Sequence, residues 1–273
     1  MYRQLLLVAI FLIGTVLPIG AAEACGPDSD CVIQDRHYRI RLPEGHNGAD
    51  KIGAIVFAHG YRGSAKGMMK NKAMAELAAK LGVALVATKS YEDDWRIPGV
   101  PRNTETDGML ELRYFDAVVE DITQRFPIDR NRMMATGFSA GGMMVWNLIC
   151  HRSQLFAGYA PMAGTFWEPE PETCDTPPTN VVHIHGEADK IVPLLGRPIV
   201  DTHQGQVPQV LEMYSNFGEY KNTDTASYGE LRCESSRNVE GNVLDFCLHA
   251  GGHSFKSEFV RHAWEIFENA GKL

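Results

Sequence analysis

Short runs of consecutive apolar residues alternate along the chain with longer segments in which apolar residues recur every three or four positions. Continuous runs are typical of strands buried on both faces of a sheet, and the wider spacing is typical of helices that bury one face. Strands that alternate with helices predict an α/β fold, a single domain with a mainly parallel sheet covered by helices on both faces. The predicted strands are 37–42, 52–58, 83–88, 132–136, 157–162, 181–185 and 243–249. The predicted helices are 66–81, 107–126, 140–150, 207–220 and 254–269.

Two positions between these elements carry further information. Gly82 directly follows the predicted helix 66–81, where a glycine is the usual C-cap residue. The segment 89–106 is polar, contains proline and glycine, and carries Trp95. Long loops of this kind often line binding or catalytic sites.

The beginning of the chain has the pattern of a secretory signal peptide. Arg3 precedes an apolar stretch over 5–17, and three small residues follow it, namely Ala21, Ala22 and Ala24. The apolar stretch is shorter than the roughly 20 residues that span a bilayer, and no comparable run follows it. We therefore expect no stable membrane insertion.

Cleavage after the last small residue would leave a signal peptide, 1–24, and a catalytic domain, 25–273, that is secreted or periplasmic. Cys25 would then stand at the new N-terminus, as in a bacterial lipoprotein. However, Ala22 and Glu23 stand where a lipoprotein signal has a Leu-like residue and a small one, which argues against lipid attachment.

The chain contains six cysteines, an even number that favours disulfides in an exported protein. No C-x-x-C motif indicates a redox or zinc site. Six cysteines allow 15 pairings, and the sequence does not choose among them. Closeness along the chain suggests Cys25 with Cys31, Cys150 with Cys174, and Cys233 with Cys247.

The formal net charge of the chain is −8. A chain with this charge has no electrostatic reason to bind nucleic acid. The simplest interpretation of the acidity is solubility.

Ser139 stands at the centre of a G-x-S-x-G motif, between a predicted strand and a predicted helix. In this context a serine sits on a sharp turn as a nucleophile, and the turn needs neighbours without bulky side chains. Gly137 and Gly141 meet that need. The alternative is a serine that only caps the helix after a glycine turn.

A serine hydroxyl needs a base to take its proton, and in such folds the partners follow the serine in the order acid, then histidine. His253 is the candidate base among the ten histidines, because it follows two glycines on a turn between the last strand and the last helix. His249 lies within the strand, where a buried structural histidine is the better interpretation.

Asp189 is the candidate acid, because it follows the predicted strand 181–185 on a turn. Glu187 is a nearby competitor that we expect to face solvent. His183 and His185 could in principle bind a metal, but no third ligand is evident, so we predict no metal site.

The oxyanion of a tetrahedral intermediate needs two N–H donors. We assign them to the backbone of Ala140, directly after the nucleophile, and of Tyr61, in the loop after an early strand. The side chain of His59 is expected to be a structural hydrogen-bonding group.

These segments resemble those of the secreted α/β-hydrolases called feruloyl esterases and polyhydroxybutyrate-depolymerase-like esterases. The similar stretches are FAHG at 57–60, FPID at 126–129, GFSAGGMM at 137–144, HIHG at 183–186 with Asp189, and GGH at 251–253. The resemblance implies the α/β-hydrolase fold and an esterase that needs no cofactor and acts through an acyl-enzyme. The chain departs from many members at Tyr61, Phe138 and Ala140, so the resemblance does not fix the substrate.

The predicted function is hydrolysis of an ester, such as a feruloyl or acetyl ester of plant cell-wall polysaccharide or a hydroxyalkanoate polyester fragment. Trp95 and Trp167 are candidates to stack on a ring of the substrate, although each could equally be a packing residue. A serine peptidase on the same fold is one alternative. A binding protein without activity is another, but no member of the candidate catalytic set is missing.

Overall fold

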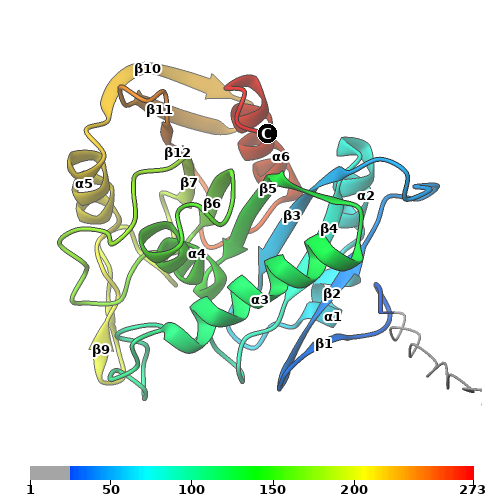
Figure 1. Cartoon of the computed structure of the whole chain (residues 1–273). Helices are drawn as coiled ribbons and strands as arrows, with labels where there is room; N and C mark the ends of the chain where they lie inside the picture. The colour runs from blue at the N-terminus through cyan, green and yellow to red at the C-terminus, as the bar shows by residue number, and fades with distance from the viewer. Residues whose placement is uncertain (1–24) are drawn as a thin grey trace, which may run out of the picture.

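The computed structural model describes residues 25–273, and the predicted signal peptide lies outside the described residues. A ten-stranded sheet runs through this part of the chain, in the order β1-β2-β4-β3-β5-β6-β7-β12-β11-β10 (Figure 1). The six strands from β4 to β12 in this order are parallel, and the outer strands on each side are antiparallel. The strands are β1 (Cys31–Ile33), β2 (Arg36–Arg41), β3 (Ile52–Ala58), β4 (Ala84–Thr88), β5 (Ile128–Phe138), β6 (Gly158–Met162), β7 (Val181–Gly186), β10 (Lys221–Tyr228), β11 (Leu231–Arg237) and β12 (Val243–His249).

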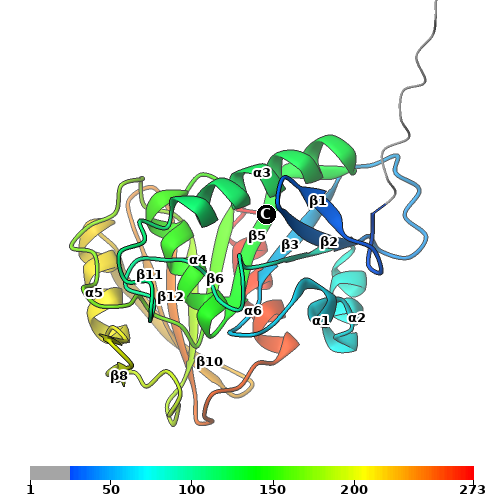
Figure 2. The same ribbon diagram turned by 90° about the horizontal axis from the view of Figure 1, so that it is seen from below.

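Helices cover both faces of the sheet, as Figures 1 and 2 show. Buried side chains of α3, α4 and α5 form one hydrophobic cluster with the first face, and those of α1, α2 and α6 form a second cluster with the other. The helices are α1 (Ala65–Met69), α2 (Lys72–Leu81), α3 (Met109–Arg125), α4 (Ala140–His151), α5 (Val207–Phe217) and α6 (Ser257–Asn269). This arrangement confirms the predicted fold class.

The central strand β3 shows how the two clusters share one sheet. Successive side chains of a strand point to opposite faces. Ala54 and Val56 therefore pack in the first cluster, while Ile55 and Phe57 pack in the second. Because both faces are buried, the strand reads as one continuous apolar run, which is why its bounds could be predicted from the sequence.

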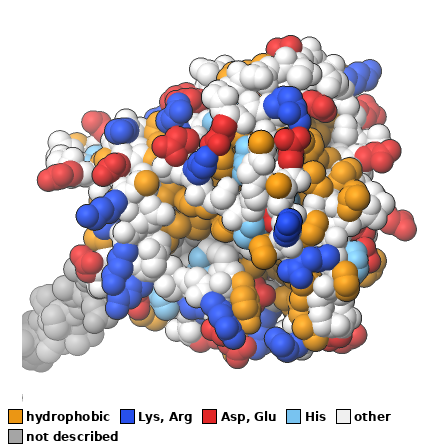
Figure 3. All heavy atoms as spheres, turned by 180° about the vertical axis from the view of Figure 1, so that it is seen from behind, with side chains coloured by type: hydrophobic (Ala, Val, Ile, Leu, Met, Phe, Trp, Pro, Cys, Tyr) orange, Lys and Arg blue, Asp and Glu red, His pale blue; other side chains and the backbone are white. Residues whose placement is uncertain are grey.

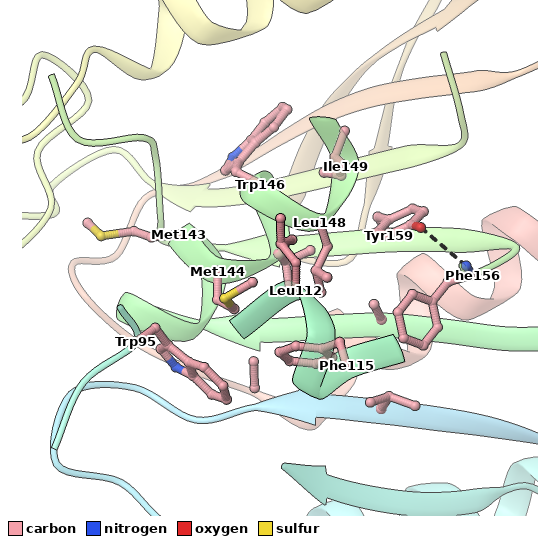
Figure 4. Close-up of a cluster of buried hydrophobic side chains, with 14 of the residues drawn as sticks. Trp95, Leu112, Phe115, Met143, Met144, Trp146, Leu148, Ile149, Phe156 and Tyr159 are labelled. Atoms are coloured by element: carbon pink, nitrogen blue, oxygen red, sulfur yellow. Dashed lines mark hydrogen bonds between the residues drawn. The ribbon is translucent and has the colours of Figure 1, made fainter. Parts of the chain in front are cut away.

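The first cluster is deepest between α3 and α4 (Figure 4). Phe115 of α3 is buried there, while Trp146 is buried on the side of α4 away from α3, beside His183 and Tyr214. Trp95 and Met143 lie near the N-terminal end of α4, where the strands of the parallel sheet also end (Figure 4). Ligand sites in open α/β sheets occur at this edge.

The region predicted as one helix over 66–81 is two helices, α1 and α2. The helix is interrupted at Asn71, whose side chain accepts a hydrogen bond of 3.1 Å from the N–H of Met74 and so caps a new helix. An N-cap of this kind satisfies an N–H that has no partner within the helix. Gly82 is in the left-handed conformation at the C-terminus of α2, which confirms its predicted role.

The sequence pattern did not predict β1, β10 or β11, nor a separate two-stranded sheet. β1 has only three residues, and the hairpin of β8 (Pro198–Ile199) and β9 (Thr202–His203) is shorter still. β10 is polar and almost wholly exposed, and it pairs only with β11 at the far edge of the sheet, with a bulge between Asn222 and Asp224. Such strands are held by backbone pairing with a neighbour. Backbone pairing does not require a regular pattern of apolar residues in the sequence.

Three disulfides join the cysteines in the pairs that closeness along the chain suggests. Among residues 25–273, no helix combines the length and the apolar character needed to cross a bilayer. Figure 3 shows acidic and basic side chains interspersed on one face of the molecule, with hydrophobic side chains gathered between them.

Candidate active site

Ser139 occupies a sharp turn between the end of β5 and the start of α4. Its backbone angles are φ 59° and ψ −124°, a region that residues other than glycine rarely adopt and that is often found at functional sites. Two hydrogen bonds hold the turn: the N–H of Ser139 donates to Met162 O at 2.9 Å, and its carbonyl accepts from the N–H of Met143 at 3.0 Å. The strand, the strained turn and the helix together expose one hydroxyl at the edge of the sheet.

Gly137 and Gly141 are required by the close approach of backbone around this turn. A Cβ atom on Gly137 would overlap the carbonyl oxygen of Gly141. A Cβ atom on Gly141 would in turn overlap the carbonyl oxygen of Ala58, at the end of β3. Any larger residue would push the helix away from the sheet and move Ser139.

Asp189 and His253 come from the ends of two adjacent strands, β7 and β12. Nδ1–H of His253 donates to Oδ2 of Asp189 at 2.7 Å. The other carboxylate oxygen, Oδ1, accepts from the N–H groups of Ile191 at 2.8 Å and Val192 at 2.9 Å. Burial opposes ionisation of Asp189, but the hydrogen bonds from His253, Val192 and Ile191 outweigh it and hold the pKa of this carboxyl below its usual value.

The ring of His253 lies beside the nucleophile turn. Its centroid is 4.5 Å from that of Phe138, the residue before Ser139. Because Nδ1 donates to Asp189, Nε2 is the nitrogen left to accept a proton. No hydrogen bond joins Ser139 to His253 within residues 25–273, and in unliganded enzymes such bonds are often long until substrate binds.

The loop that carries Tyr61 is fixed by its backbone and by His59. The N–H of Arg62 donates to Asp93 O at 2.7 Å, and that of Gly63 donates to Gly60 O at 2.8 Å. Nε2 of His59 accepts from the N–H of Ser90 at 3.2 Å, so its proton is on Nδ1, which donates to Gly60 O at 2.8 Å. Burial lowers the pKa of His59 to about 4, which keeps the ring neutral in this structural role.

Both assigned oxyanion donors border the same pocket as Ser139, and neither N–H is used by the hydrogen bonds that hold the turns. Ala140 is the first residue of α4, and the first N–H groups of a helix have no partner within it. Tyr61 also lines this pocket, and half of its side chain is exposed.

Trp95 anchors the loop 89–106 to the oxyanion loop. Its indole Nε1–H donates to the carbonyl oxygen of His59 at 2.7 Å, and its ring packs 5.5 Å from that of Phe115. The side chain is only 1% exposed, although it contributes to the pocket wall. Its position therefore favours packing over stacking on a substrate. Trp167 also lines the pocket and is 8% exposed.

A buried ion pair also holds the loop 89–106. Nη1 of Arg36 lies 2.7 Å from Oε2 of Glu111, and both side chains are buried. Oε1 of Glu111 accepts from the N–H of Arg96 at 3.0 Å, and the guanidinium of Arg36 lies over the ring of Tyr114 at 3.5 Å. Sequence reasoning missed this pair because its members lie on separate elements, 75 positions apart (111 minus 36).

His183 and His185 form a chain of buried hydrogen bonds behind Asp189. Nε1–H of Trp146 donates to Nδ1 of His183 at 3.2 Å, so the proton of His183 is on Nε2, which donates to Nδ1 of His185 at 3.0 Å. Nε2–H of His185 then donates to Val192 O at 2.8 Å and lies 3.6 Å from Oδ2 of Asp189. Burial lowers the pKa of both histidines and keeps them neutral, so the chain holds the loop that presents Asp189.

The two competitors for catalytic roles lie elsewhere. Glu187 is exposed and pairs with Arg232 at 2.7 Å. His249 is buried, stacks on Phe259 at 5.0 Å between ring centroids, and accepts from the N–H of Gly251. The geometry agrees with the expectation that neither residue takes part in the chemistry.

A pocket of about 790 Å³ opens beside Ser139. The loop 89–106, the turn after β7 and the β8–β9 hairpin form its walls. Sequence reasoning missed most of the polar residues that line it, among them Asp94 and Gln204. Burial raises the pKa of Asp94 to about 6. Neither residue stands in a recognisable motif, so no local signal could have found them.

One group of potential metal ligands occurs in residues 25–273, formed by Cys233, Cys247 and His262. The two sulfur atoms are bonded to each other as a disulfide, so they cannot act as thiolate ligands. The two histidines considered above, His183 and His185, have their ring nitrogens engaged in hydrogen bonds.

Comparison with known proteins places this site in context. The phospholipase/carboxylesterase family model matches residues 102–208, which include Ser139 and Asp189. NocK of Nocardia uniformis subsp. tsuyamanensis, named as a candidate esterase, is 32% identical over 66% of this chain, and the match spans 52% of NocK, about half its length. Feruloyl esterase C of Emericella nidulans is 24% identical, over 72% of this chain and 73% of its own.

The fold is shared with solved esterases. Acetyl xylan esterase from Aspergillus awamori superposes with a TM-score of 0.58 at 14% identity, covering 92% of this chain and 97% of its own. These matches confirm the predicted resemblance to feruloyl esterases. The chain has the α/β-hydrolase fold, and in sequence it is similar to phospholipase/carboxylesterases over residues 102–208 and to a feruloyl esterase over 72% of its length.

Proposed function

We propose that the protein is an exported serine carboxylesterase that hydrolyses its substrate through an acyl-enzyme on Ser139. The hydrogen bond between His253 and Asp189, next to a strained serine turn at a pocket, is the observation that carries this proposal. A nucleophile, a base and an acid that orients the base are the groups that acyl transfer needs.

In the first half of the reaction, Oγ of Ser139 attacks the ester carbonyl carbon while Nε2 of His253 takes the hydroxyl proton. The negative charge that develops on the carbonyl oxygen is held by the N–H groups of Tyr61 and Ala140. Asp189 stabilises the imidazolium that forms, since its carboxylate already accepts Nδ1–H. When the bond to the alcohol breaks, His253 gives its proton to the leaving oxygen.

In the second half, His253 takes a proton from water, and the hydroxide attacks the acyl group on Ser139. The same N–H groups hold the second tetrahedral intermediate. Collapse returns the proton to Oγ and releases the acid, so the enzyme is restored. None of these steps calls for a cofactor.

The names of the relatives and the size of the pocket support a proposal for the substrate class. Relatives and structural neighbours carry the names feruloyl esterase and acetyl xylan esterase. The pocket has room for an acyl group larger than acetate. We propose feruloyl or acetyl esters of plant polysaccharide as the first candidates and hydroxyalkanoate oligomers as the next. Three disulfides suit an oxidising compartment outside the cytoplasm, in agreement with a signal peptide at 1–24.

The proposal is tested by labelling the folded protein with a fluorophosphonate probe, together with Ser139→Ala and a matched control, Ser227→Ala. Ser227 is exposed on β10, at the far edge of the sheet. The wild type and Ser227→Ala should be labelled, and Ser139→Ala should not. Equal labelling of Ser139→Ala would reject the assignment of the nucleophile.

The reaction class is then tested by comparing nitrophenyl esters with peptide anilides. Hydrolysis of methyl ferulate, acetylated xylan and hydroxybutyrate oligomers ranks the ester substrates. Faster cleavage of the anilides than of the esters would favour a peptidase and overturn the proposal.

A further inference from the structure

Gln204 is a buried polar side chain on the wall of the active-site pocket. It is 4% exposed, and its Oε1 atom is buried without a hydrogen-bond partner among residues 25–273. Buried side-chain oxygens in folded proteins nearly always have a partner, so an unpaired one needs an explanation. An absent ligand is such an explanation when the residue borders a pocket.

The backbone holds Gln204 in place from both sides. Its N–H donates to Arg197 O at 2.9 Å, and its carbonyl accepts from Nδ1 of His203 at 2.7 Å. It also forms an isolated antiparallel bridge with Trp167. These contacts fix the backbone of Gln204, so the backbone cannot shift to bring the side chain to another protein partner. The amide group can still rotate.

The pocket that Gln204 borders has an apolar part, and charged residues such as Asp94, Arg96 and Arg102 line the rest of it. Trp167, Val100 and Ile199 line the same pocket, and Met143 approaches from the N-terminal end of α4, which Figure 4 shows. A polar amide among apolar and aromatic walls is the usual composition of a site that binds an apolar group and reads one polar atom on it.

A half-turn of the amide exchanges its acceptor oxygen and its donor nitrogen. A hydroxyl group can both donate and accept, so it can pair with the amide in either orientation. A carbonyl or an ether oxygen pairs with only one orientation. The hydroxyl is therefore the group that this site satisfies best.

We propose that Gln204 is a specificity-determining residue that binds a hydroxyl group on the substrate and so selects hydroxylated esters. The hydroxyl can be carried by the acyl part or by the alcohol part of the ester. This inference rests on the proposed esterase function and names the chemical feature that the same site recognises.

The test uses two pairs of esters that differ by one hydroxyl. Methyl 4-hydroxycinnamate against methyl cinnamate places the hydroxyl on the acyl part, and 2-(4-hydroxyphenyl)ethyl acetate against 2-phenylethyl acetate places it on the alcohol part. For each pair, the ratio of kcat/KM values is measured in the wild type, in Gln204→Leu and in Gln209→Leu. Gln209 is exposed on α5 and outside this pocket, so it controls for the same chemical change.

The wild type and Gln209→Leu should favour the hydroxylated ester of one pair by roughly ten- to a hundredfold, because a site built for a hydroxyl rejects the analogue that leaves its amide unpaired. Gln204→Leu should abolish this preference, mainly by slowing the hydroxylated ester. A ratio near one in the wild type for both pairs, or an unchanged ratio in Gln204→Leu, would overturn the inference. Equal slowing of both esters would indicate a structural role and would also overturn it.

A measurement on the wild type alone covers the case in which Gln204→Leu does not fold. Inhibition by 4-hydroxycinnamate is compared with inhibition by cinnamate, and inhibition by 2-(4-hydroxyphenyl)ethanol with that by 2-phenylethanol. Tighter inhibition by the hydroxylated member of one pair supports the inference, and equal inhibition within both pairs rejects it. Failure of the wild type to hydrolyse any ester would instead reject the esterase function itself, so the two failures are distinguishable.

Discussion

The indole N–H of Trp95 donates to the backbone carbonyl of His59, two residues before Tyr61. This bond connects the loop that forms one pocket wall to the loop that we assign to the oxyanion site. We therefore expect this buried tryptophan to influence the reaction rate without contact with the reacting atoms.

Trp95→Phe should lower kcat by roughly tenfold with little change in KM, which is less than the loss caused by deleting an oxyanion donor outright. The ring still fills the space, but the loop before Tyr61 loses its anchor. Steady-state kinetics on a nitrophenyl ester measure the effect. Trp264→Phe is the matched control, since Trp264 is equally buried on α6, at the opposite face of the sheet. Comparable losses of kcat in both variants would argue against the anchoring role.

Asp189→Asn should reduce kcat by roughly 10³- to 10⁴-fold, because an amide no longer holds His253 in the tautomer that accepts a proton at Nε2. The folded structure should persist, since asparagine fills the same volume. Glu187→Gln, two residues earlier and exposed, should leave kcat unchanged. Stopped assays with long time courses detect the residual rate. If Glu187→Gln were the more damaging change, the acid would be misassigned.

Substitutions at different points of the hydrogen-bond chain through His183 and His185 should affect kcat to different degrees. His185→Phe removes the donor to Val192 and leaves the Nε2–H of His183 unpaired, so the free energy of unfolding should fall by about 1–3 kcal/mol, and kcat should fall with it. Trp146→Phe removes only the donor at the far end of the chain. We expect it to destabilise the protein by a similar amount but to leave kcat nearly unchanged.

Urea unfolding gives the stability of each variant, and a pH–rate profile separates a positioning role from a purely structural one. The pH–rate profile should change in His185→Phe and stay the same in Trp146→Phe. Identical profiles for the two variants would mean that the chain only supports the fold.

Buried histidines predict a loss of stability in mild acid. The pKa of His59, lowered to about 4, and those of His183 and His185, also lowered by burial, lie below the value of 6.5 in the unfolded chain. As the pH falls below 6.5, the unfolded chain binds protons that the folded chain does not, so the free energy of unfolding decreases until the pH reaches the folded pKa. For His59 alone this loss is at most about 3 kcal/mol.

Asp189 does not offset this loss. Its folded pKa is lowered, so its stabilising contribution is present above about 3.8 and disappears only below that pH. Urea unfolding at about pH 7.5 and about pH 4.5 should show the difference in the wild type, and His59→Gln should show a smaller one. A wild-type stability that is the same at both pH values would contradict the prediction.

How well a site residue could be predicted depended on how far along the chain its contacts reach. The turn around Ser139 is local, because a strand, two glycines and a helix adjoin it in the sequence. Asp189 and His253 are far apart in the sequence, but they follow the ends of neighbouring parallel strands and could be placed by the order of the elements. Gln204 has no such signal, since only tertiary packing brings it to the pocket.

The same difference between local and long-range signals applies to the fold. Strands such as β3 are buried on both faces, so their apolar composition predicts them. β10 and β11 are joined through backbone pairing at the edge of the sheet, and the polar residues of β10 carry no comparable pattern. The break at Asn71 divides a segment whose apolar spacing continues across it, so periodicity alone could not separate α1 from α2.

The exposed strand β10 also bears on how the protein behaves at high concentration. An unpaired sheet edge is a template on which a second chain can add a strand and begin to aggregate. β10 interrupts that template with a bulge between Asn222 and Asp224, and it carries Lys221 at its start. Charge and irregularity on an outer strand disfavour intermolecular pairing, so we expect this edge to resist the addition of a second chain.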